Sequence, residues 1–272
     1  MEQRRIAVIG AGNMGTALIR GMLKAHWCSP ANMRATGPHE EKMVALAREL
    51  QIKASTVNGE AARWADTIVL AVKPQILDRV LDEIRPAVQP GALVVSIAAG
   101  VTTAHIESKL PQGTPVVRTM PNVAATVELG ATAMCGGRSA TEKELEVARK
   151  IFQSVGIVVE VSEELMDAVT GLSGTGPMYV FQIIEGLSDA GVRVGLSRDV
   201  SNALTVQTVL GAAKMVQDSG RHPGYLKDMV TSPGGTAIAA LHSLERNGLR
   251  ALLMDAVEAA TKRSAELGGR KS

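Results

Sequence analysis

The chain has 272 residues, 46% of them hydrophobic, and its 29 basic and 27 acidic side chains nearly balance. This length suits one large domain or two ordinary ones with an ample core. The balanced charge and an aromatic content of 2% argue against nucleic acid or an anionic membrane as a partner. No apolar run reaches the roughly 18–20 residues of a membrane span, and a strand begins at Arg5 with no signal peptide before it. We therefore expect a soluble, cytoplasmic protein.

The first predicted element is an apolar strand over residues 5–9, which leads into a glycine pattern and then a helix with one apolar face. This strand–glycine–helix order is what the dinucleotide-binding fingerprint Gly-x-Gly-x-x-Gly requires. Its first glycine makes the turn, the second lets the backbone approach a pyrophosphate, and the third packs the helix on the strand. We predict a nicotinamide cofactor here; the alternative is a glycine-rich turn in another doubly wound sheet. The predicted cofactor-binding residues are Gly10, Gly12, Asn13, Met14 and Gly15.

The end of the second strand, residues 33–36, bears on the choice of cofactor. NAD-binding sites usually place an acidic residue there to hold the ribose 2′-hydroxyl. Here no acid occurs before Glu40, whereas Arg34, Thr36 and His39 would suit a 2′-phosphate. We predict that NADPH is preferred while NADH remains usable. Arg34 as a solvated strand residue is the alternative.

Further strands are predicted over residues 53–55, 67–72, 92–97, 115–120, 131–135 and 157–161, with helices over 40–50 and 141–154. Ligands of doubly wound sheets bind beyond the carboxyl ends of the strands. Three of those ends carry small or turn-forming residues that would let a flat ring lie against the backbone. Lys73 also has a bland interpretation as a solvated loop lysine. The candidates are Ala71, Val72, Lys73, Pro74, Ala98 and Asn122.

Other catalytic patterns are missing from the sequence. It contains no Ser-His-Asp set, Walker loop or metal-ligand spacing, so we predict no metal. Cys28 and Cys135 lie in apolar contexts without redox spacing, and we expect both to be reduced.

The strand rhythm stops after about residue 164, and helices are predicted over residues 178–191, 198–218, 223–230, 234–246 and 248–267. Between Asp199 and Asp218 the only charged residue is Lys214, so that helix should be buried on most sides. About 105 residues of helix make a thin domain, and we predict that a second copy completes its core. The predicted fold class is α/β: a Rossmann domain over residues 1–164 and an all-helical dimerisation and substrate domain over residues 165–272.

The stretch from Thr231 to Ala237 reads Thr-Ser-Pro-Gly-Gly-Thr-Ala. Proline and two glycines predict a tight loop, and the apolar periodicity after it predicts a helix. A helix N-terminus offers free N–H groups to an anion, and bare glycines let a ligand approach. The alternative is an ordinary Ser/Thr-capped helix. A second glycine-rich break, residues 171–177, precedes another predicted helix.

Taken together, these segments resemble the pyrroline-5-carboxylate reductase family over essentially the whole length. The resemblance is carried by IAVIGAGNMG (6–15), AVKP (71–74), SIAAG (96–100), MPN (120–122), GLSGTGP (171–177), DAGV (189–192), QTVLGAAK (207–214) and residues 222–241 around SPGGT. The blocks GLSGTGP and SPGGT are the most particular.

The resemblance implies NAD(P)H-dependent reduction of 1-pyrroline-5-carboxylate to L-proline, the last step of proline biosynthesis, by a homodimer. In several members five dimers form a decamer. By motif position, Ser232 and the backbone N–H groups of Gly235, Thr236 and Ala237 would bind the substrate carboxylate. Asn58 would lie near the adenine-side ribose. The implied substrate-binding residues are Thr175, Ser232, Gly234, Gly235, Thr236 and Ala237, and those nearest the chemistry are Ser232, Thr236 and Ala237.

One departure from the family pattern concerns the chemistry. The family usually has Thr where this chain has Ala237, and that hydroxyl is placed to bond the ring nitrogen. Reduction of a different cyclic imine on the same scaffold is therefore one alternative, and a non-catalytic NADP-binding regulator is another. The usual Thr-Pro after Met-Pro-Asn is replaced by Val123-Ala124, which we interpret as tolerated loop variation.

Overall fold

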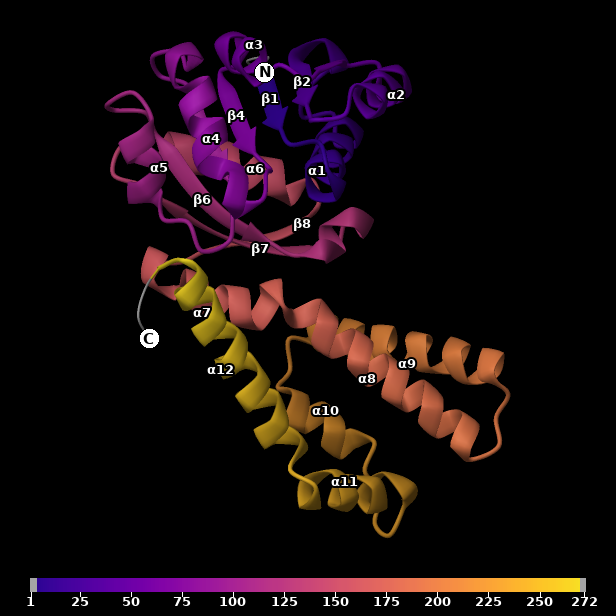
Figure 1. Cartoon of the computed structure of the whole chain (residues 1–272). Helices are drawn as coiled ribbons and strands as arrows, with labels where there is room; N and C mark the ends of the chain where they lie inside the picture. Colours follow the sequence, from indigo (N-terminus) through magenta and orange to yellow (C-terminus); the bar gives the residue numbers. More distant parts are fainter. Residues whose placement is uncertain (1–3, 270–272) are drawn as a thin grey trace. The chain divides into compact units, whose positions relative to one another are not determined.

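The computed structural model describes residues 4–269, which fold into two compact units. The first unit extends to Thr175 and includes the end of the chain from Glu258, and the second comprises Gly176–Val257 (Figure 1). Each unit has its own architecture. The sheet lies wholly in the first unit, and the second is helical.

The first unit is built on one eight-stranded sheet with the order β3-β2-β1-β4-β5-β6-β7-β8. Neighbouring strands are parallel except β6 and β7, which pair antiparallel. The strand order reverses at β1, and such a switch point is where doubly wound sheets bind ligands. The strands are β1 (Ile6–Ile9), β2 (Met33–Thr36), β3 (Lys53–Ser55), β4 (Thr67–Leu70), β5 (Leu93–Ser96), β6 (Val116–Pro121), β7 (Gly130–Gly136) and β8 (Gly156–Glu160).

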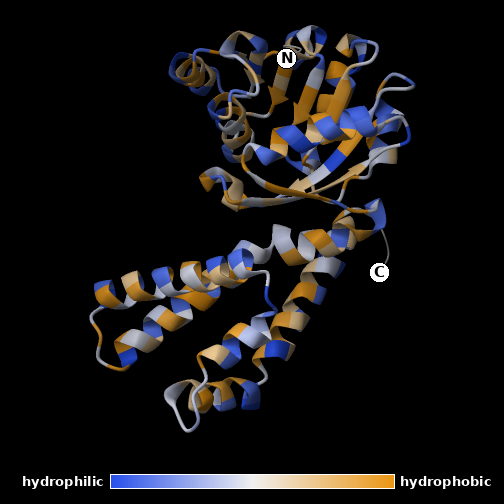
Figure 2. Cartoon of the chain, turned by 180° about the vertical axis from the view of Figure 1, so that it is seen from behind, coloured by the Kyte–Doolittle hydropathy of each residue, from blue (hydrophilic) through white to orange (hydrophobic). Residues whose placement is uncertain are grey.

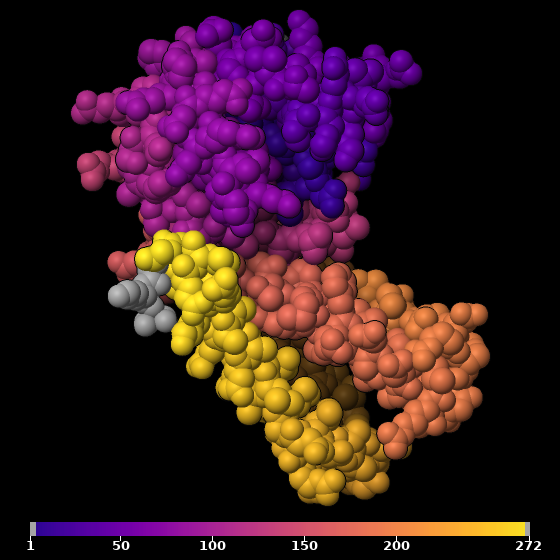
Figure 3. All heavy atoms as spheres, viewed as in Figure 1, coloured from indigo at the N-terminus to yellow at the C-terminus, as the bar shows by residue number. Residues whose placement is uncertain are grey.

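Helices cover both faces of this sheet. One core holds the apolar side chains of α1 (Asn13–Lys24), α2 (Glu40–Leu50) and α6 (Glu142–Gln153). The opposite core holds those of α3 (Asn58–Trp64), α4 (Pro74–Ile84) and α5 (Thr103–Lys109), whose atoms cover the sheet in Figure 3. Both faces of the sheet are therefore shielded from solvent, which is why most of its parallel strands are continuous apolar runs. Short 3₁₀ turns lie at Pro30–Asn32, Arg85–Ala87, Val123–Val127 and Glu163–Leu165.

An ionic contact holds the segment after β8 against the sheet. Glu163 accepts hydrogen bonds from the backbone N–H and the hydroxyl of Thr103, both at 2.7 Å, and from the buried guanidinium of Arg118 at 3.2 Å. Burial raises the pKa of the Glu163 carboxyl, but these hydrogen bonds outweigh it and leave the pKa below its usual range. Glu163 therefore stays ionised at neutral pH and fixes the chain where it leaves the sheet.

The next segment explains why the first unit does not end after residue 164, the boundary expected from the sequence. Helix α7 (Met166–Val169) runs into a π-helix, Thr170–Gly174, and Met166 is buried beneath the sheet. Asp167 accepts a 2.8 Å hydrogen bond from the hydroxyl of Ser264, near the end of α12 (Leu249–Leu267). The last turns of α12 are thereby part of the first unit.

The second unit contains α8 (Gly176–Arg193), α9 (Arg198–Ser219), α10 (Pro223–Met229), α11 (Thr236–Arg246) and the first part of α12. Helices α8 and α9 pack closely, because the hydroxyl of Ser201 donates to the Ser188 carbonyl at 2.7 Å and a Cβ on Gly191 would clash with that hydroxyl. The buried residues of α9 are Ser201 and Thr205.

Apolar side chains remain exposed along these helices, including Phe181 at 62%, Leu204 at 56% and Met254 at 66%. Hydrophobic residues are spread along the helices of the second unit, as their orange colour shows (Figure 2). Helix α9, which the sequence predicts to be buried on most sides, is thus largely uncovered in the single chain. A thin helical unit with this much exposed apolar surface is typical of a chain that associates with another.

Candidate functional site

The loop between β1 and α1 has the geometry that its three glycines predict. Gly10 has a φ of +100°, and a Cβ there would lie 2.6 Å from the carbonyl oxygen of Ala71. A Cβ on Gly15 would clash with the Gly10 carbonyl. A Cβ on Gly12 would meet no protein atom within 4 Å, so that position is open on its outer side. The first and third glycines serve the fold, and the second leaves room for a ligand.

The N-terminus of α1 has free backbone N–H groups that can bind an anion. Gly12 is the N-cap, and no side chain caps the helix. The loop N–H groups of Gly10 and Ala11 both donate to the Thr36 carbonyl, at 2.9 and 2.8 Å, which fixes the loop against the end of β2. The first-turn N–H groups at Asn13 and Met14 are left to face a ligand. This end of a 12-residue helix can therefore hold the pyrophosphate of a dinucleotide.

The end of β2 is tied to α3 by side chains. Thr36 donates its hydroxyl hydrogen to the Oδ1 of Asn58 at 2.6 Å, and Asn58 donates from Nδ2 to Glu83 at 2.9 Å. The sequence predicts both Thr36 and Asn58 as cofactor-binding residues, and the structure places them in direct contact at the carboxyl edge of the sheet. With the bonds from the glycine loop to the Thr36 carbonyl, predicted residues from the first three βα units are thus brought together.

Arg34 is held by a residue that sequence analysis missed. Its guanidinium stacks on the ring of Trp64, 4.3 Å from the centroid, and donates to the Glu60 carbonyl at 3.5 Å. The Nε of Arg34 is buried without a partner among residues 4–269. Trp64 lies on α3, a helix for which the polar residues at 58–60 give no periodic signal. The stack holds the Arg34 guanidinium against the last residue of α3, and its contact with a ribose 2′-phosphate stays a prediction.

The next three strand ends lie side by side, because β4, β5 and β6 are neighbours in the sheet. After β4, the Ala71 N–H donates to the Ile9 carbonyl at 2.8 Å, and the exposed Lys73 is the N-cap of α4. After β5, Ala98 is 2% exposed. Val72 lies with Ala71 and Lys73 in the turn between β4 and α4, and Pro74 is the first residue of α4.

Asn122, at the end of β6, has a structural partner on each side of its amide. Its Nδ2 donates to the Ser173 carbonyl at 3.1 Å, and its Oδ1 accepts from the Ala131 N–H at 3.2 Å. Asn122 therefore fastens β6 to β7 and to the π-helix. Its contact with a cofactor stays a prediction.

The glycine-rich segment 171–177 is helical, where the sequence predicts a break. The π-helix ends at Gly174, and a Cβ there would lie 2.6 Å from the Met120 side chain. Thr175 closes the turn by donating both its N–H and its hydroxyl hydrogen to the Thr170 carbonyl, at 2.9 and 3.0 Å. Thr175 is thus the last residue of the first unit, and its hydroxyl hydrogen is already engaged.

The second-unit loop Thr231–Gly235 leads into α11 without a side-chain cap. Gly235 is the N-cap in extended geometry, and Gly234 has a φ of +66°. Neither Ser232 nor Thr236 donates to or caps the helix, so the ordinary Ser/Thr cap, which was the alternative interpretation, is wrong. The Gly235 N–H donates to the Ser232 carbonyl at 3.1 Å, which leaves the first-turn N–H groups from Thr236 onward open.

The Ser232 hydroxyl adds a donor to this helix end. A Cβ on Gly235 would clash with the Oγ of Ser232, so only glycine lets that hydroxyl lie over the backbone. Among residues 4–269 no hydrogen-bond partner engages the hydroxyls of Ser232 or Thr236. Ala237 presents a half-buried methyl group beside them. The arrangement can bind a small carboxylate by backbone N–H groups and one hydroxyl.

The described residues also bear on metal binding, membrane insertion and cysteine chemistry. No group of three His, Cys, Asp or Glu side chains in residues 4–269 is placed to hold a metal ion. No helix in that range has both the length and the hydropathy needed to cross a bilayer. Both cysteines are free, and Cys135 is buried.

Comparison with known proteins gives the same picture over the whole chain. Residues 163–267 match the family model of pyrroline-5-carboxylate reductase dimerisation, and residues 5–100 match that of NADP oxidoreductase, coenzyme F420-dependent. The chain is 48% identical to the pyrroline-5-carboxylate reductase of Methanosarcina acetivorans, with 98% of this chain and 99% of that protein covered. The Pseudomonas aeruginosa enzyme of the same name is 43% identical, with 98% of each covered.

Solved structures agree. The pyrroline-5-carboxylate reductase of Coxiella burnetii superimposes with a TM-score of 0.93 at 35% identity, covering 100% of both chains. The Plasmodium falciparum pyrroline carboxylate reductase, solved with NADP bound, gives a TM-score of 0.88 at 36% identity over 98% of this chain and 99% of that one. With two glycine-lined helix ends and relatives this similar along its full length, the chain belongs to the pyrroline-5-carboxylate reductase family.

Proposed function

We propose that this chain reduces 1-pyrroline-5-carboxylate to L-proline with a reduced nicotinamide cofactor. The observation that carries the proposal is the uncapped N-terminus of α11, with the unpartnered Ser232 hydroxyl over Gly235, in a chain of this family. An imino acid has one carboxylate that needs such a site. The substrate is therefore a small anionic imine.

The cofactor is assigned to the first unit. The N-terminus of α1, the open side of Gly12 and the Thr36–Asn58 pair at the sheet edge support it. When bound, the reduced nicotinamide supplies the hydride. The backbone N–H groups of Asn13 and Met14 are proposed to hold the pyrophosphate. The small residues after β4 and β5 are proposed to leave room for the flat nicotinamide ring.

NADPH is proposed as the preferred cofactor, with NADH usable. The end of β2 carries Thr36 rather than a carboxylate, and Arg34 supplies a fixed positive charge on Trp64. A ribose 2′-hydroxyl would lack its usual acidic acceptor there, whereas a 2′-phosphate would gain a cation.

Substrate positioning is assigned to α11. The first-turn N–H groups of Thr236 and Ala237 and the Ser232 hydroxyl are proposed to donate to the carboxylate. The Gly235 N–H is excluded from this set while it donates to the Ser232 carbonyl. Holding the imine carbon about 3–3.5 Å from the hydride donor supplies much of the rate enhancement, and a protonated imine needs little further acid–base help.

A second candidate is reduction of a different cyclic imine at the same site. Ala237 favours it, because a methyl group cannot hydrogen-bond a ring nitrogen. A ring that presents less polar surface at that point would fit the methyl better. The non-catalytic regulator is disfavoured, since a sensor of the cofactor alone has no need of a second anion site.

The test is cofactor oxidation at 340 nm with 1-pyrroline-5-carboxylate, run beside a panel of other cyclic imines and with NADPH and NADH in turn. We expect the highest kcat/KM with 1-pyrroline-5-carboxylate and a KM for NADPH about tenfold below that for NADH, the effect of roughly 1.4 kcal/mol of binding to the 2′-phosphate. Stronger turnover of another imine would leave the fold intact and replace the substrate. A lower KM for NADH would refute the NADPH preference.

The assembly is proposed to be a homodimer built on the second unit, and a pentamer of such dimers at the highest order. The match of residues 163–267 to the dimerisation model and the exposed apolar side chains of α8 and α9 support the dimer. The fivefold arrangement is proposed from the family resemblance.

A further inference from the structure

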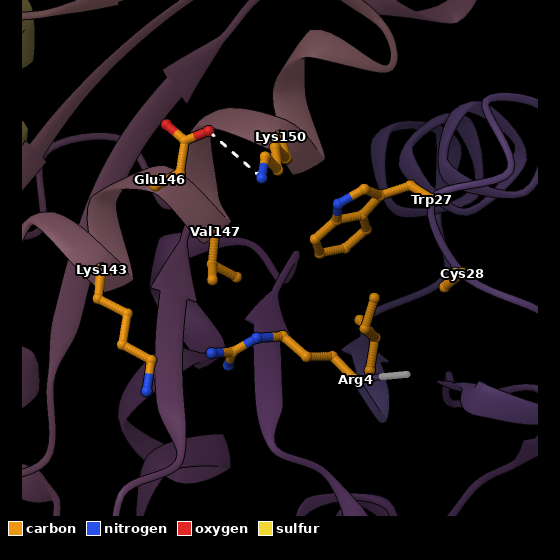
Figure 4. A pocket seen from close by; sticks show the side chains of 8 residues that line it. Arg4, Trp27, Cys28, Lys143, Glu146, Val147 and Lys150 are labelled. Carbon is orange, nitrogen blue, oxygen red and sulfur yellow. Dashed lines mark ion pairs between the residues drawn. The ribbon is translucent and has the colours of Figure 1, made fainter. Parts of the chain in front are cut away.

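A pocket lies in the first unit at the opposite end of the strands from the glycine loop. It has a volume of about 390 Å³ and opens beside Ile6, the first residue of β1, whereas the cofactor loop follows Ile9 at the other end of that strand. Its walls come from the N-terminal residues, from the turn after α1 and from one side of α6 (Figure 4). This volume lies in the range of small-molecule sites.

The pocket carries an excess of positive charge. Three of its lining side chains are cationic, Arg4, Lys143 and Lys150, and one is acidic, Glu146. Glu146 is already paired with two cations, Arg149 at 2.5 Å and Lys150 at 3.5 Å.

Two lining cations, Arg4 and Lys143, form no ion pair with any residue in the range 4–269. Arg4 nevertheless lies near enough to Asp66, and Lys143 near enough to Glu144, to help lower the pKa values of those carboxyls. The other carboxylates of α6 are engaged elsewhere, since Glu142 pairs with Arg149 at 3.3 Å and Glu144 forms the capping box with Thr141. An anionic ligand would supply the direct ion pair that these two cations lack in that range.

The remaining wall is aromatic. The indole of Trp27 is half-buried and reaches into the pocket toward Val147, between the side chains of Lys150 and Arg4 (Figure 4). Its Nε1–H has no acceptor among residues 4–269. Burial raises the pKa of the neighbouring Cys28 thiol to about 11, so that wall is neutral at pH 7.

We propose that this pocket binds a nucleoside diphosphate, with the phosphates between Arg4 and Lys143 and the base against the Trp27 indole. Guanidinium and ammonium groups are the usual protein ligands of phosphate. Any of the nucleotide bases can stack on the face of an indole ring. The site is separate from the cofactor loop, because the two lie at opposite ends of β1. It would be a second nucleotide site in the same unit.

The test is quenching of Trp27 fluorescence by ADP, with the cofactor site first saturated by NADP⁺. Trp27 and Trp64 are the two tryptophans of the chain, so Trp27→Phe isolates the signal of Trp64. We expect saturable quenching that is lost in Trp27→Phe. Lys143→Gln and Arg4→Gln should each weaken apparent affinity at least fivefold, and Lys262→Gln, an exposed cation outside the pocket, should not.

Pyrophosphate and adenosine serve as matched probes. The proposal expects ADP to bind at least fivefold tighter than either one. Quenching that persists in Trp27→Phe, ADP affinity unchanged in both charge variants, or equal affinity for pyrophosphate and ADP would each overturn it. Thermal unfolding of every variant, compared with the unsubstituted chain, separates loss of binding from loss of fold. Catalysis is not part of the readout, so failure here would leave the reductase assignment standing.

Discussion

Three small residues, Ser232, Gly235 and Ala237, shape the proposed carboxylate site at the N-terminus of α11. Gly235 is required because a Cβ there would clash with the Ser232 hydroxyl, and that hydroxyl is left without a protein partner in the described part of the chain. Ala237, two residues on, contributes a methyl group where the family resemblance implies a hydroxyl. In the proposed site, carboxylate binding and bonding to the ring nitrogen are therefore separable: the proposed carboxylate donors are present, and a side chain that could bond the ring nitrogen is not.

Ala237→Thr tests what that loss costs. If the proposed site is correct, the new hydroxyl should stabilise the transition state by about 1 kcal/mol and raise kcat on 1-pyrroline-5-carboxylate roughly fivefold. Initial rates at saturating NADPH measure it. Ala240→Thr, the same change on the same helix almost one turn further on, is the control and should leave kcat unchanged. An unaltered kcat in Ala237→Thr would reject the account of the missing hydroxyl.

At the scale of elements, the sequence predicts strands and long helices well. The predicted strand 33–36 and helix 40–50 agree with β2 and α2, and the capping box that starts α6 is present. These elements are set by local signals: apolar runs, helical periodicity and the chemistry of a cap. The glycine loops were also predictable, because closely spaced glycines before a helix are visible in the sequence. Gly10, Gly15 and Gly235 exclude a Cβ on steric grounds, whereas Gly12 is open.

The elements that the sequence did not predict depend on tertiary contacts. Helix α3 has only seven residues, buries mainly Ala61 and Ala62, and holds Trp64 against Arg34, so its signal appears only once the sheet is formed. The π-helix Thr170–Gly174 replaces a predicted break because Asn122 and Met120 pack on it. No local sequence pattern predicts that β7 pairs antiparallel with β6.

The same limit applies to the site. Sequence analysis found the residues at the two helix ends, since a bare glycine loop before a helix is visible in one dimension. It did not find Trp64, nor that the Gly235 N–H is used internally, nor that both sides of the Asn122 amide have protein partners. The Trp64 stack and the hydrogen bond from Asn122 to Ser173 join segments that are distant in the sequence. The hydrogen bond from Gly235 to Ser232 instead depends on the exact geometry of a local turn.

At the scale of the whole molecule, the second unit buries few side chains on its own. Leu204 on α9 is 56% exposed, and comparable side chains line α8 and α12. At roughly 25 cal/mol per Å² of apolar surface, covering such helices with a second copy favours association strongly.

Light scattering at micromolar concentration should therefore give a mass of at least two 28.5 kDa chains, and about ten chains if the pentamer of dimers forms. Leu204→Lys should lower the average mass by opposing burial of that helix. Val44→Lys, at 54% exposure on α2 of the first unit, is the matched control and should not change it. A monomer for the unsubstituted chain would contradict the dimer.

Helix α11 is proposed to recognise the carboxylate of an imino acid. This recognition is measured by comparing kcat/KM for 1-pyrroline-5-carboxylate with kcat/KM for 1-pyrroline, the same ring without the carboxylate, in the unsubstituted chain and in Ser232→Ala. Hydrogen bonds to a charged group contribute about 1.5–3 kcal/mol each, so two or more should favour the carboxylate substrate at least about 100-fold. Ser232→Ala should reduce that ratio roughly tenfold while leaving 1-pyrroline turnover unchanged. Equal kcat/KM for the two rings would contradict the claim.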